Sequence, residues 1–227
     1  MSLDCSRPTH GHHRKHRPLL SPRGAAGPFG VIPAALAVAL AVVACGGGGS
    51  NPLDNPPTVQ NGVVVGGQRL SFAYFQRCIN PIFLAQLQIT HGGTTSTNTC
   101  AGAGCHADAT GTGGALRIVP TAQPVDLADP ANTPDVIRTT EIYRNFYSAQ
   151  GEVVIGSTTQ SRLLAKPLLL NVLHGGGQVF PDLNDPNAKL IQYWITHPAP
   201  QGQDEFSTAT YVMFTPPDPM NGTCNTQ

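Results

Sequence analysis

The segment Cys100-Ala-Gly-Ala-Gly-Cys105-His106 places two thiols and an imidazole within seven residues, near the middle of a chain of 227 residues. It lies in a polar, glycine-rich stretch, Thr90–Thr112, for which no helix is predicted. We expect a loop to follow from Gly113-Gly114 to Thr133.

Two thiols followed directly by a histidine form the arrangement that fixes a c-type haem, because the thiols add across the vinyl groups and the imidazole reaches the iron. The usual spacer between the cysteines has two residues, whereas this chain has four. All four are alanine or glycine, so a wider turn can lie against the porphyrin without side-chain clash. On spacing alone, three other interpretations stay open: a small disulfide loop between Cys100 and Cys105, a zinc site with His106 and His174, and two unrelated thiols.

A helix is predicted on the N-terminal side of this loop, between Leu70 and Leu87. Apolar residues recur there at spacings of three and four, as on one face of a helix. These residues are Phe72, Phe75, Ile79, Ile82, Phe83 and Leu87. Pro81 lies inside the run, so the helix is expected to kink or divide there.

Three more helical segments are predicted after the loop. Thr133 is the expected N-cap of a helix that ends before Gly151, Ser161–Leu173 predicts short turns broken at a proline, and Asp185 caps a last helix. The first of these helices is expected to bury Val136, Tyr143, Phe146 and Tyr147. We predict a mostly α fold: one small helical domain, residues 68–227, with long loops and a turn-rich C-terminal tail.

The order of these segments resembles the cytochrome c superfamily, from about Phe72 to His197. The matching pieces are Asn80-Pro-Ile-Phe-Leu84, the cysteine–histidine segment, Gly113-Gly-Ala-Leu116, Ser161-Arg-Leu-Leu-Ala-Lys-Pro167, His174-Gly-Gly-Gly-Gln-Val-Phe180 and Leu190-Ile-Gln-Tyr-Trp-Ile195. The resemblance implies a cytochrome-c-like domain in which the first and last helices cross beside the haem, which suits Phe75 and Trp194 as partners. It also implies one covalent haem c on Cys100 and Cys105, with His106 as the proximal iron ligand.

A low-spin haem needs a second axial ligand. The methionines beyond the leader, Met213 and Met220, both follow the last helix, and His91 and His197 are less favourably placed than His174. Three glycines follow His174, which would let the backbone pass close to a porphyrin face. We choose His174 as the candidate distal ligand. The alternative is a histidine that only holds the glycine turn by a hydrogen bond. The carbonyl of Pro120 is a candidate acceptor for the Nδ1–H of His106, and the alternative is that Pro120 is an ordinary loop proline.

The N-terminal region reads as an export signal. Residues 1–30 are basic, and residues 31–44 are apolar and uncharged, which is the length of a signal-peptide core and too short to span a bilayer. The sequence Val42-Val-Ala-Cys45 resembles the lipobox of bacterial lipoproteins. We therefore predict a signal peptide over 1–44, a lipidated Cys45 and a flexible linker over 45–67.

Two cysteines remain after these assignments, Cys78 and Cys224, and in an oxidising compartment we expect them to form a disulfide.

The charge balance and the absence of a hydrolase motif exclude some classes of function. The chain has 13 basic and 13 acidic residues, and removing the five basic and one acidic residue of 1–44 leaves 8 and 12, so we expect no nucleic-acid partner. Neither Ser157 nor Ser161 lies in the G-x-S-x-G motif of a hydrolase, so no enzyme activity is expected.

We predict an electron-transfer protein in the cell envelope, on its periplasmic or surface side. Gly46 after the cysteine favours the outer membrane, and the redox partner is unknown. The alternative is a haem-free envelope lipoprotein of cytochrome-c-like descent that acts as a binding or structural module.

Overall fold

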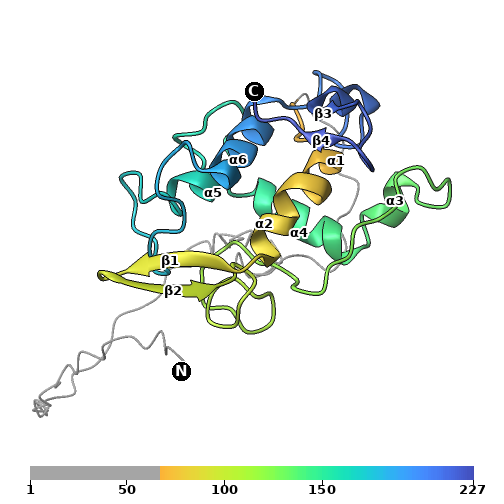
Figure 1. The fold of residues 1–227 in the computed structure, drawn as a ribbon. Coiled ribbons are helices and arrows are strands. Elements are labelled where there is room, and N and C mark those ends of the chain that lie inside the picture. The colour runs from red at the N-terminus through yellow and green to blue at the C-terminus, as the bar shows by residue number, and fades with distance from the viewer. Residues whose placement is uncertain (1–66) are drawn as a thin grey trace, which may run out of the picture. The chain divides into compact units, whose positions relative to one another are not determined.

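The computed structural model describes residues 67–227. The predicted signal peptide over 1–44, the lipidated Cys45 and nearly all of the linker lie outside the described residues. The described chain forms short helices and two two-stranded antiparallel sheets (Figure 1). Within residues 67–227, no helix is long and apolar enough to cross a membrane.

The first predicted helix is one helical run with a wide turn in its middle. It consists of α1 (Phe72–Tyr74), a π-helical turn η1 (Phe75–Ile79) and α2 (Asn80–Leu84). Ser71 caps its start by accepting from the backbone N–H of Tyr74. Pro81 cannot donate a hydrogen bond, and it lies in the first turn of α2, directly after the π-helical turn. The helical run therefore changes its turn just before Pro81, but it continues without division to Leu84.

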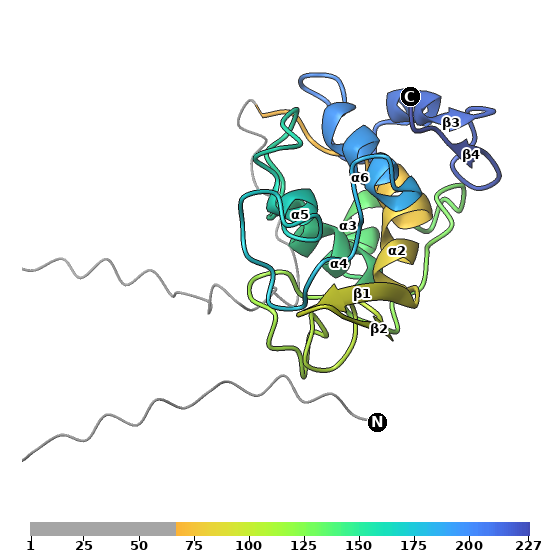
Figure 2. The same cartoon turned by 60° about the vertical axis from the view of Figure 1, so that its left-hand side comes forward.

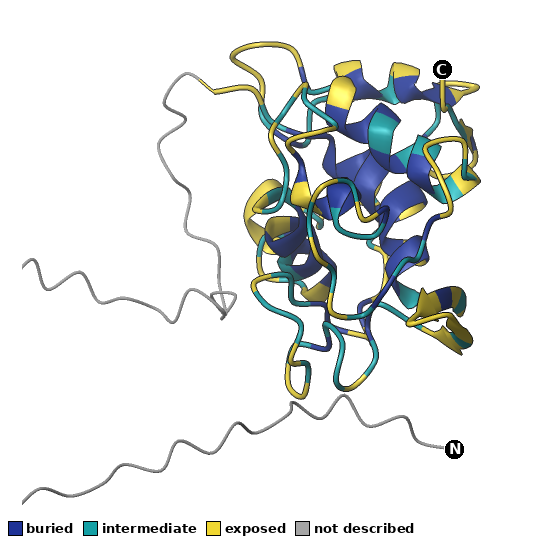
Figure 3. Ribbon diagram, turned by 90° about the vertical axis from the view of Figure 1, so that its left-hand side faces the viewer, coloured by how far each residue is buried: buried dark blue, intermediate teal, exposed yellow. Residues whose placement is uncertain are grey.

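The hydrophobic core lies where this helix meets α4 (Glu141–Gln150) and α6 (Pro186–Thr196). The ring of Phe75 is 5.4 Å from Trp194 and 5.4 Å from Phe146, and all three side chains are fully buried. The predicted partnership of Phe75 with Trp194 is confirmed. Figure 3 shows the buried residues gathered along the facing sides of the helices, whereas the outer loops are exposed. Aromatic packing of this kind accounts for much of the energy of a small core.

A β-hairpin that the sequence did not predict occupies Leu87–Asn98, at the start of the polar, glycine-rich stretch. Strands β1 (Leu87–His91) and β2 (Thr94–Asn98) pair antiparallel, with Leu87 opposite Asn98 and His91 opposite Thr94. The two residues between the strands, Gly92 and Gly93, both have positive φ, as a two-residue hairpin turn of the favoured type requires. The hairpin extends below α2 in Figure 1 and in Figure 2.

The prediction of a mostly α, cytochrome-c-like fold class is therefore wrong. Besides the hairpin, the C-terminal segment contains a second small sheet, of β3 (Phe214–Thr215) and β4 (Thr223–Cys224), after a 3₁₀ helix η2 (Thr208–Met213). Thr90, Thr94, Thr95 and Thr97 explain the hairpin, since β-branched residues favour strands even where both faces are wet. The expected turn-rich tail is thus an ordered segment packed on the core.

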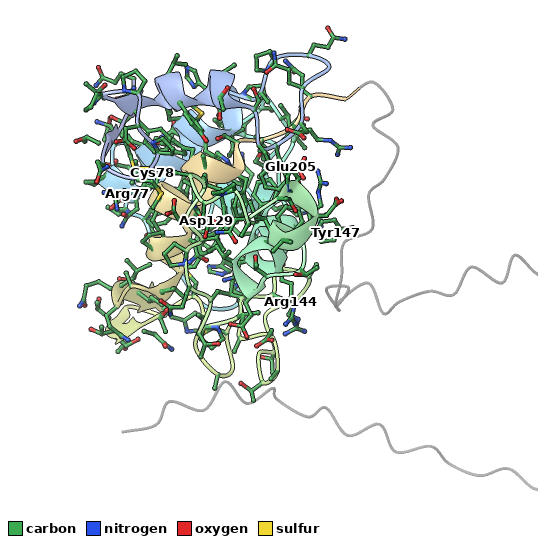
Figure 4. All side chains as sticks on the ribbon, turned by 90° about the vertical axis from the view of Figure 1, so that its right-hand side faces the viewer. Arg77, Cys78, Asp129, Arg144, Tyr147 and Glu205 are labelled. Atoms are coloured by element: carbon green, nitrogen blue, oxygen red, sulfur yellow. A yellow bond between two sulfur atoms is a disulfide. The ribbon has the colours of Figure 1, made fainter. Side chains whose placement is uncertain are left out.

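The segment after Thr133 forms two helices, not one. Thr133 caps α3 (Pro134–Ile137), and Thr140 caps α4. Because of this break, the four residues expected on one buried face do not share an environment. Tyr143 and Phe146 are buried, whereas Val136 and Tyr147 are exposed. Figure 4 shows Tyr147 at the outer side of α4.

The later predictions are confirmed. α5 (Arg162–Ala165) ends before Pro167, and Asp185 caps α6 with two hydrogen bonds. Cys78 and Cys224 form a disulfide that joins the first helix to β4.

Candidate functional site

The cysteine–histidine segment forms a chain of tight turns fastened to the end of α2. The carbonyl of Phe83 accepts from the Thr99 hydroxyl at 2.6 Å and from the Ala101 N–H at 3.0 Å. The carbonyl of Gly102 then accepts from the N–H groups of Cys105 and Ala107. A Cβ on Gly102 would lie 2.8 Å from the Asn98 side chain and 3.0 Å from the Thr99 carbonyl oxygen, so the spacer turn passes close to both residues.

Cys100 and Cys105 are thiols that are not joined to each other by a disulfide. Burial raises the pKa of the Cys100 thiol to about 11, and the nearby charge of Cys105 adds to the rise. A buried thiol of this kind is protonated at neutral pH and is a poor metal ligand as it stands, because metals bind the thiolate.

His106 follows Cys105 and is held from one side by the loop that returns to it. Its Nδ1 lies 3.1 Å from the carbonyl oxygen of Leu116, which accepts the Nδ1–H. Gly113 packs against the same ring, and a Cβ there would lie 2.7 Å from Nδ1. The prediction that Pro120 accepts this hydrogen bond is wrong, because Leu116 lies on the turn that passes the ring and Pro120 lies beyond it.

His174 lies in the loop between α5 and α6. Its Nδ1 lies 2.6 Å from the carbonyl oxygen of Gly177, so the glycine turn also accepts an Nδ1–H. Both imidazoles thus use Nδ1 for a backbone carbonyl, which fixes the tautomer with Nε2 unprotonated. Nε2 is therefore the nitrogen that each ring can offer to a metal.

The fold brings His106 and His174 together across 68 positions of sequence. The ring centroids lie 6.1 Å apart, and the ring planes are 11° from parallel. A metal ion about 2 Å from a nitrogen of each ring would lie roughly 3 Å from each ring centre, which separates the centres by about 6 Å. The observed separation of the ring centres therefore matches two imidazoles bound to one metal ion, and the nearly parallel planes are those of a widely spaced stacked pair.

An open pocket adjoins the two histidines, with a volume of about 430 Å³ that includes open solvent. Its remaining lining includes Gly113 and Leu116 from the loop after His106, Glu152 from the segment between α4 and α5, and Arg162, Leu163, Lys166 and Pro167 from α5 and the residues after it. The apolar members suit a flat ring system, and Arg162 and Lys166 suit its carboxylates.

The electrostatics of the pocket keep both imidazoles neutral. Burial lowers the pKa of His106 to about 4; the hydrogen bond with Leu116 opposes this fall, and His174, Lys166 and Arg117 add to it. Burial also lowers the pKa of His174, against the hydrogen bond with Gly177 and together with the charge of Lys166. Neutral imidazole is the form that binds metals.

The other candidate ligands lie elsewhere. His91 is exposed on β1, and the His197 ring stacks 3.8 Å from the ring of Tyr193 at the end of α6. Met213 is buried in the core, and Met220 is partly exposed in the C-terminal segment. None of these four residues lines the pocket. Within residues 67–227 there is no cluster of three or more His, Cys, Asp or Glu side chains arranged to hold a metal ion.

Sequence reasoning missed Leu116, Gly113 and Glu152. A carbonyl acceptor carries no side-chain signal, but the Gly113-Gly114 pair seven residues after His106 marked a close backbone approach that could have indicated the position.

Comparisons with protein-family models, with curated proteins and with solved structures find no match to this chain. The resemblance to the cytochrome c superfamily therefore stays a prediction.

Proposed function

We propose that this chain carries one covalently bound haem c and transfers electrons in the cell envelope. Cys100 and Cys105 would hold the porphyrin, and His106 and His174 would bind its iron. The observation that supports this most directly is the pair of neutral imidazoles with centroids 6.1 Å apart, each with its Nδ1 directed to a backbone carbonyl. A haem in this pocket supplies one-electron redox chemistry at its iron.

The residues of the chain supply attachment, orientation and burial. The spacer turn is closed by the N–H of His106, which donates to the carbonyl of Cys100 at 2.9 Å, and the bonds of Phe83 to Thr99 and Ala101 fix that turn to the core. The carbonyls of Leu116 and Gly177 orient the two rings and raise their basicity as ligands. Two histidine ligands favour a lower reduction potential than a histidine–methionine pair.

Lys166 and Arg162 would face the carboxylates of the bound porphyrin. Both line the pocket, and no ion pair joins either of them to an acidic residue in the described part of the chain. A carboxylate that enters the pocket would therefore find two cations in place. Lipidation of Cys45 would hold the protein to a membrane, with the described domain beyond a linker over 45–67.

The test is expression of the full chain in a bacterium that has the haem-attachment machinery. We expect the purified protein to gain the mass of one haem, to keep its colour in acidified acetone, and to show the sharp spectrum of a six-coordinate low-spin iron. The double variant Cys100→Ser with Cys105→Ser should lose the covalent pigment. His174→Ala should keep the pigment and lose the low-spin spectrum, whereas the control His197→Ala should match the wild type. Colourless protein with a disulfide between Cys100 and Cys105 would contradict the proposal and favour the haem-free lipoprotein.

A further inference from the structure

The hairpin β1–β2 is joined to the His174 loop by a two-bond bridge. The N–H of Thr90 donates to the carbonyl of Gln178 at 2.9 Å, and the N–H of Gln178 donates back to the carbonyl of Thr90 at 2.8 Å. A reciprocal pair of this kind is the unit of an antiparallel ladder, so the loop extends the edge of the hairpin by one residue. The bridge ends four positions after His174.

Gly177 connects this bridge to the imidazole. Its carbonyl accepts from Nδ1 of His174 at 2.6 Å, and its N–H donates to the carbonyl of His174 at 2.9 Å. Its φ is +92°, and a Cβ at this position would lie 2.5 Å from the Thr90 carbonyl oxygen and 2.9 Å from the Cβ of His91. Gly177 thus permits both the turn that holds the ring and the close approach of the hairpin.

The rest of the loop makes little contact with the core. The side chain of Leu173, directly before His174, is 91% exposed, and Gly175 is exposed directly after it. On its C-terminal side the loop is next anchored where Val179 and Phe180 donate to the carbonyl of Pro167. His106, in contrast, is positioned by its own loop, through Leu116 and Gly113.

We propose that the hairpin β1–β2 is the element that positions His174 opposite His106, with Thr90 and Gly177 as positioning residues. This inference rests on the proposed function, because it concerns the second axial ligand of the haem. It assigns the two histidines to different parts of the fold. The loop that carries Cys100, Cys105 and His106 would hold the covalent attachment, and the hairpin would hold His174. Loss of the hairpin contact should therefore release His174 and leave the covalent attachment intact.

The first variant is Gly177→Ala, and its matched control is Gly175→Ala. A Cβ on Gly175 meets nothing within 4 Å, so the control adds the same methyl group to the same loop without touching the hairpin. The second variant removes the hairpin by replacing residues 88–97 with Asn-Gly. Leu87 and Asn98 are paired, so a two-residue turn can join them. This variant serves even where Gly177→Ala does not fold.

The measurements on purified holoprotein are haem mass, the absorption and electron paramagnetic resonance spectra, and the response to added imidazole. Gly177→Ala and the hairpin-free variant should keep one covalent haem and lose the low-spin signal, and imidazole should restore it. Gly175→Ala should match the wild type. Amide exchange at Gln178 should be at least about tenfold faster in Gly177→Ala than in Gly175→Ala, because the bridge protects that N–H.

Two results separate failure of this inference from failure of the proposed function. A wild type with a low-spin covalent haem, together with unchanged spectra in Gly177→Ala and in the hairpin-free variant, would overturn the inference alone. A colourless wild type would contradict the proposed function. In that case, the rate of amide hydrogen exchange at Gln178 in the haem-free protein would decide the inference. Equal exchange rates in Gly177→Ala and Gly175→Ala would overturn it.

Discussion

At the scale of single residues, the buried carboxylate of Glu205 is the centre of a polar cluster. One oxygen accepts from the Arg138 guanidinium at 2.9 and 3.0 Å and from the Tyr143 hydroxyl at 2.6 Å. The Arg138 guanidinium also lies 5.0 Å from the centre of the Phe206 ring. Burial, together with the nearby carboxylate, raises the pKa of Tyr143. Figure 4 shows Glu205 beside the end of α4. The cluster joins α3, α4 and the segment after α6.

Removing this carboxylate should destabilise the fold strongly. Glu205→Ala removes the buried acceptor of both Arg138 and Tyr143, which we expect to lower the free energy of unfolding by about 3 kcal/mol. The control is Asp135→Ala, which removes an exposed partner of the same arginine, 3.4 Å away, and should cost less than about 1 kcal/mol. Urea unfolding followed by circular dichroism measures both. Equal losses of unfolding free energy in the two variants would show that the buried carboxylate stabilises the fold no more than the exposed one.

The residues of the site were predictable to the extent that they carry side-chain chemistry. The cysteine spacing and the glycines after His174 indicated the two histidines, and the fold brings the two rings together. The acceptors of their Nδ1–H groups are backbone carbonyls, which no residue type marks. Pro120 was therefore chosen where Leu116 performs that role.

At the scale of the elements, the start of α6 depends on one side chain. Oδ1 of Asp185 accepts from the N–H groups of Asn187 and Ala188 at 2.8 and 3.1 Å. α6 carries Trp194, whose indole N–H donates to the carbonyl of Ser71, so the position of this helix is coupled to the first one.

Asp185→Ala should lower the free energy of unfolding by about 1 kcal/mol, because two N–H groups lose their acceptor. Asp185→Asn keeps a capping oxygen and removes the charge, so it should stay close to the wild type. Thermal unfolding of the three proteins compares them directly. A loss in the asparagine variant as large as in the alanine variant would assign the effect to charge and not to the cap.

Elements with a buried face were predictable, and elements without one were not. Apolar residues three and four apart predict both α6 and the first helix, because one side of each helix packs in the core. The hairpin has only Ile89 buried among the residues of its two strands, so neither alternation nor helical period marks it. The division between α3 and α4 likewise depends on the cap at Thr140, inside what reads as a single helix.

At the scale of the whole molecule, the disulfide between Cys78 and Cys224 spans 146 positions. It fixes the second small sheet to the middle of the first helix, and Figure 4 shows Cys78 on that helix. In the chain-entropy account, a cross-link of this length stabilises the fold by about 3–5 kcal/mol through the unfolded chain.

The variant Cys78→Ala with Cys224→Ala should therefore unfold at a lower urea concentration, by an amount near that figure. Protease should also cleave the segment after Thr208 sooner than in the wild type. Reducing agent should reproduce both effects in the wild type and add nothing in the variant. An identical digestion pattern with and without reducing agent would exclude a role for the bond in holding this segment.

Arg69 and Phe72, at the start of the described chain, are bonded to a part of the molecule remote from the histidines. The carbonyl of Arg69 accepts from Ala199, and the N–H of Phe72 donates to the carbonyl of Glu205. Neither partner lines the pocket. Tension applied at Arg69 therefore acts first on these backbone bonds, which share no residue with the bonds that orient the two imidazoles.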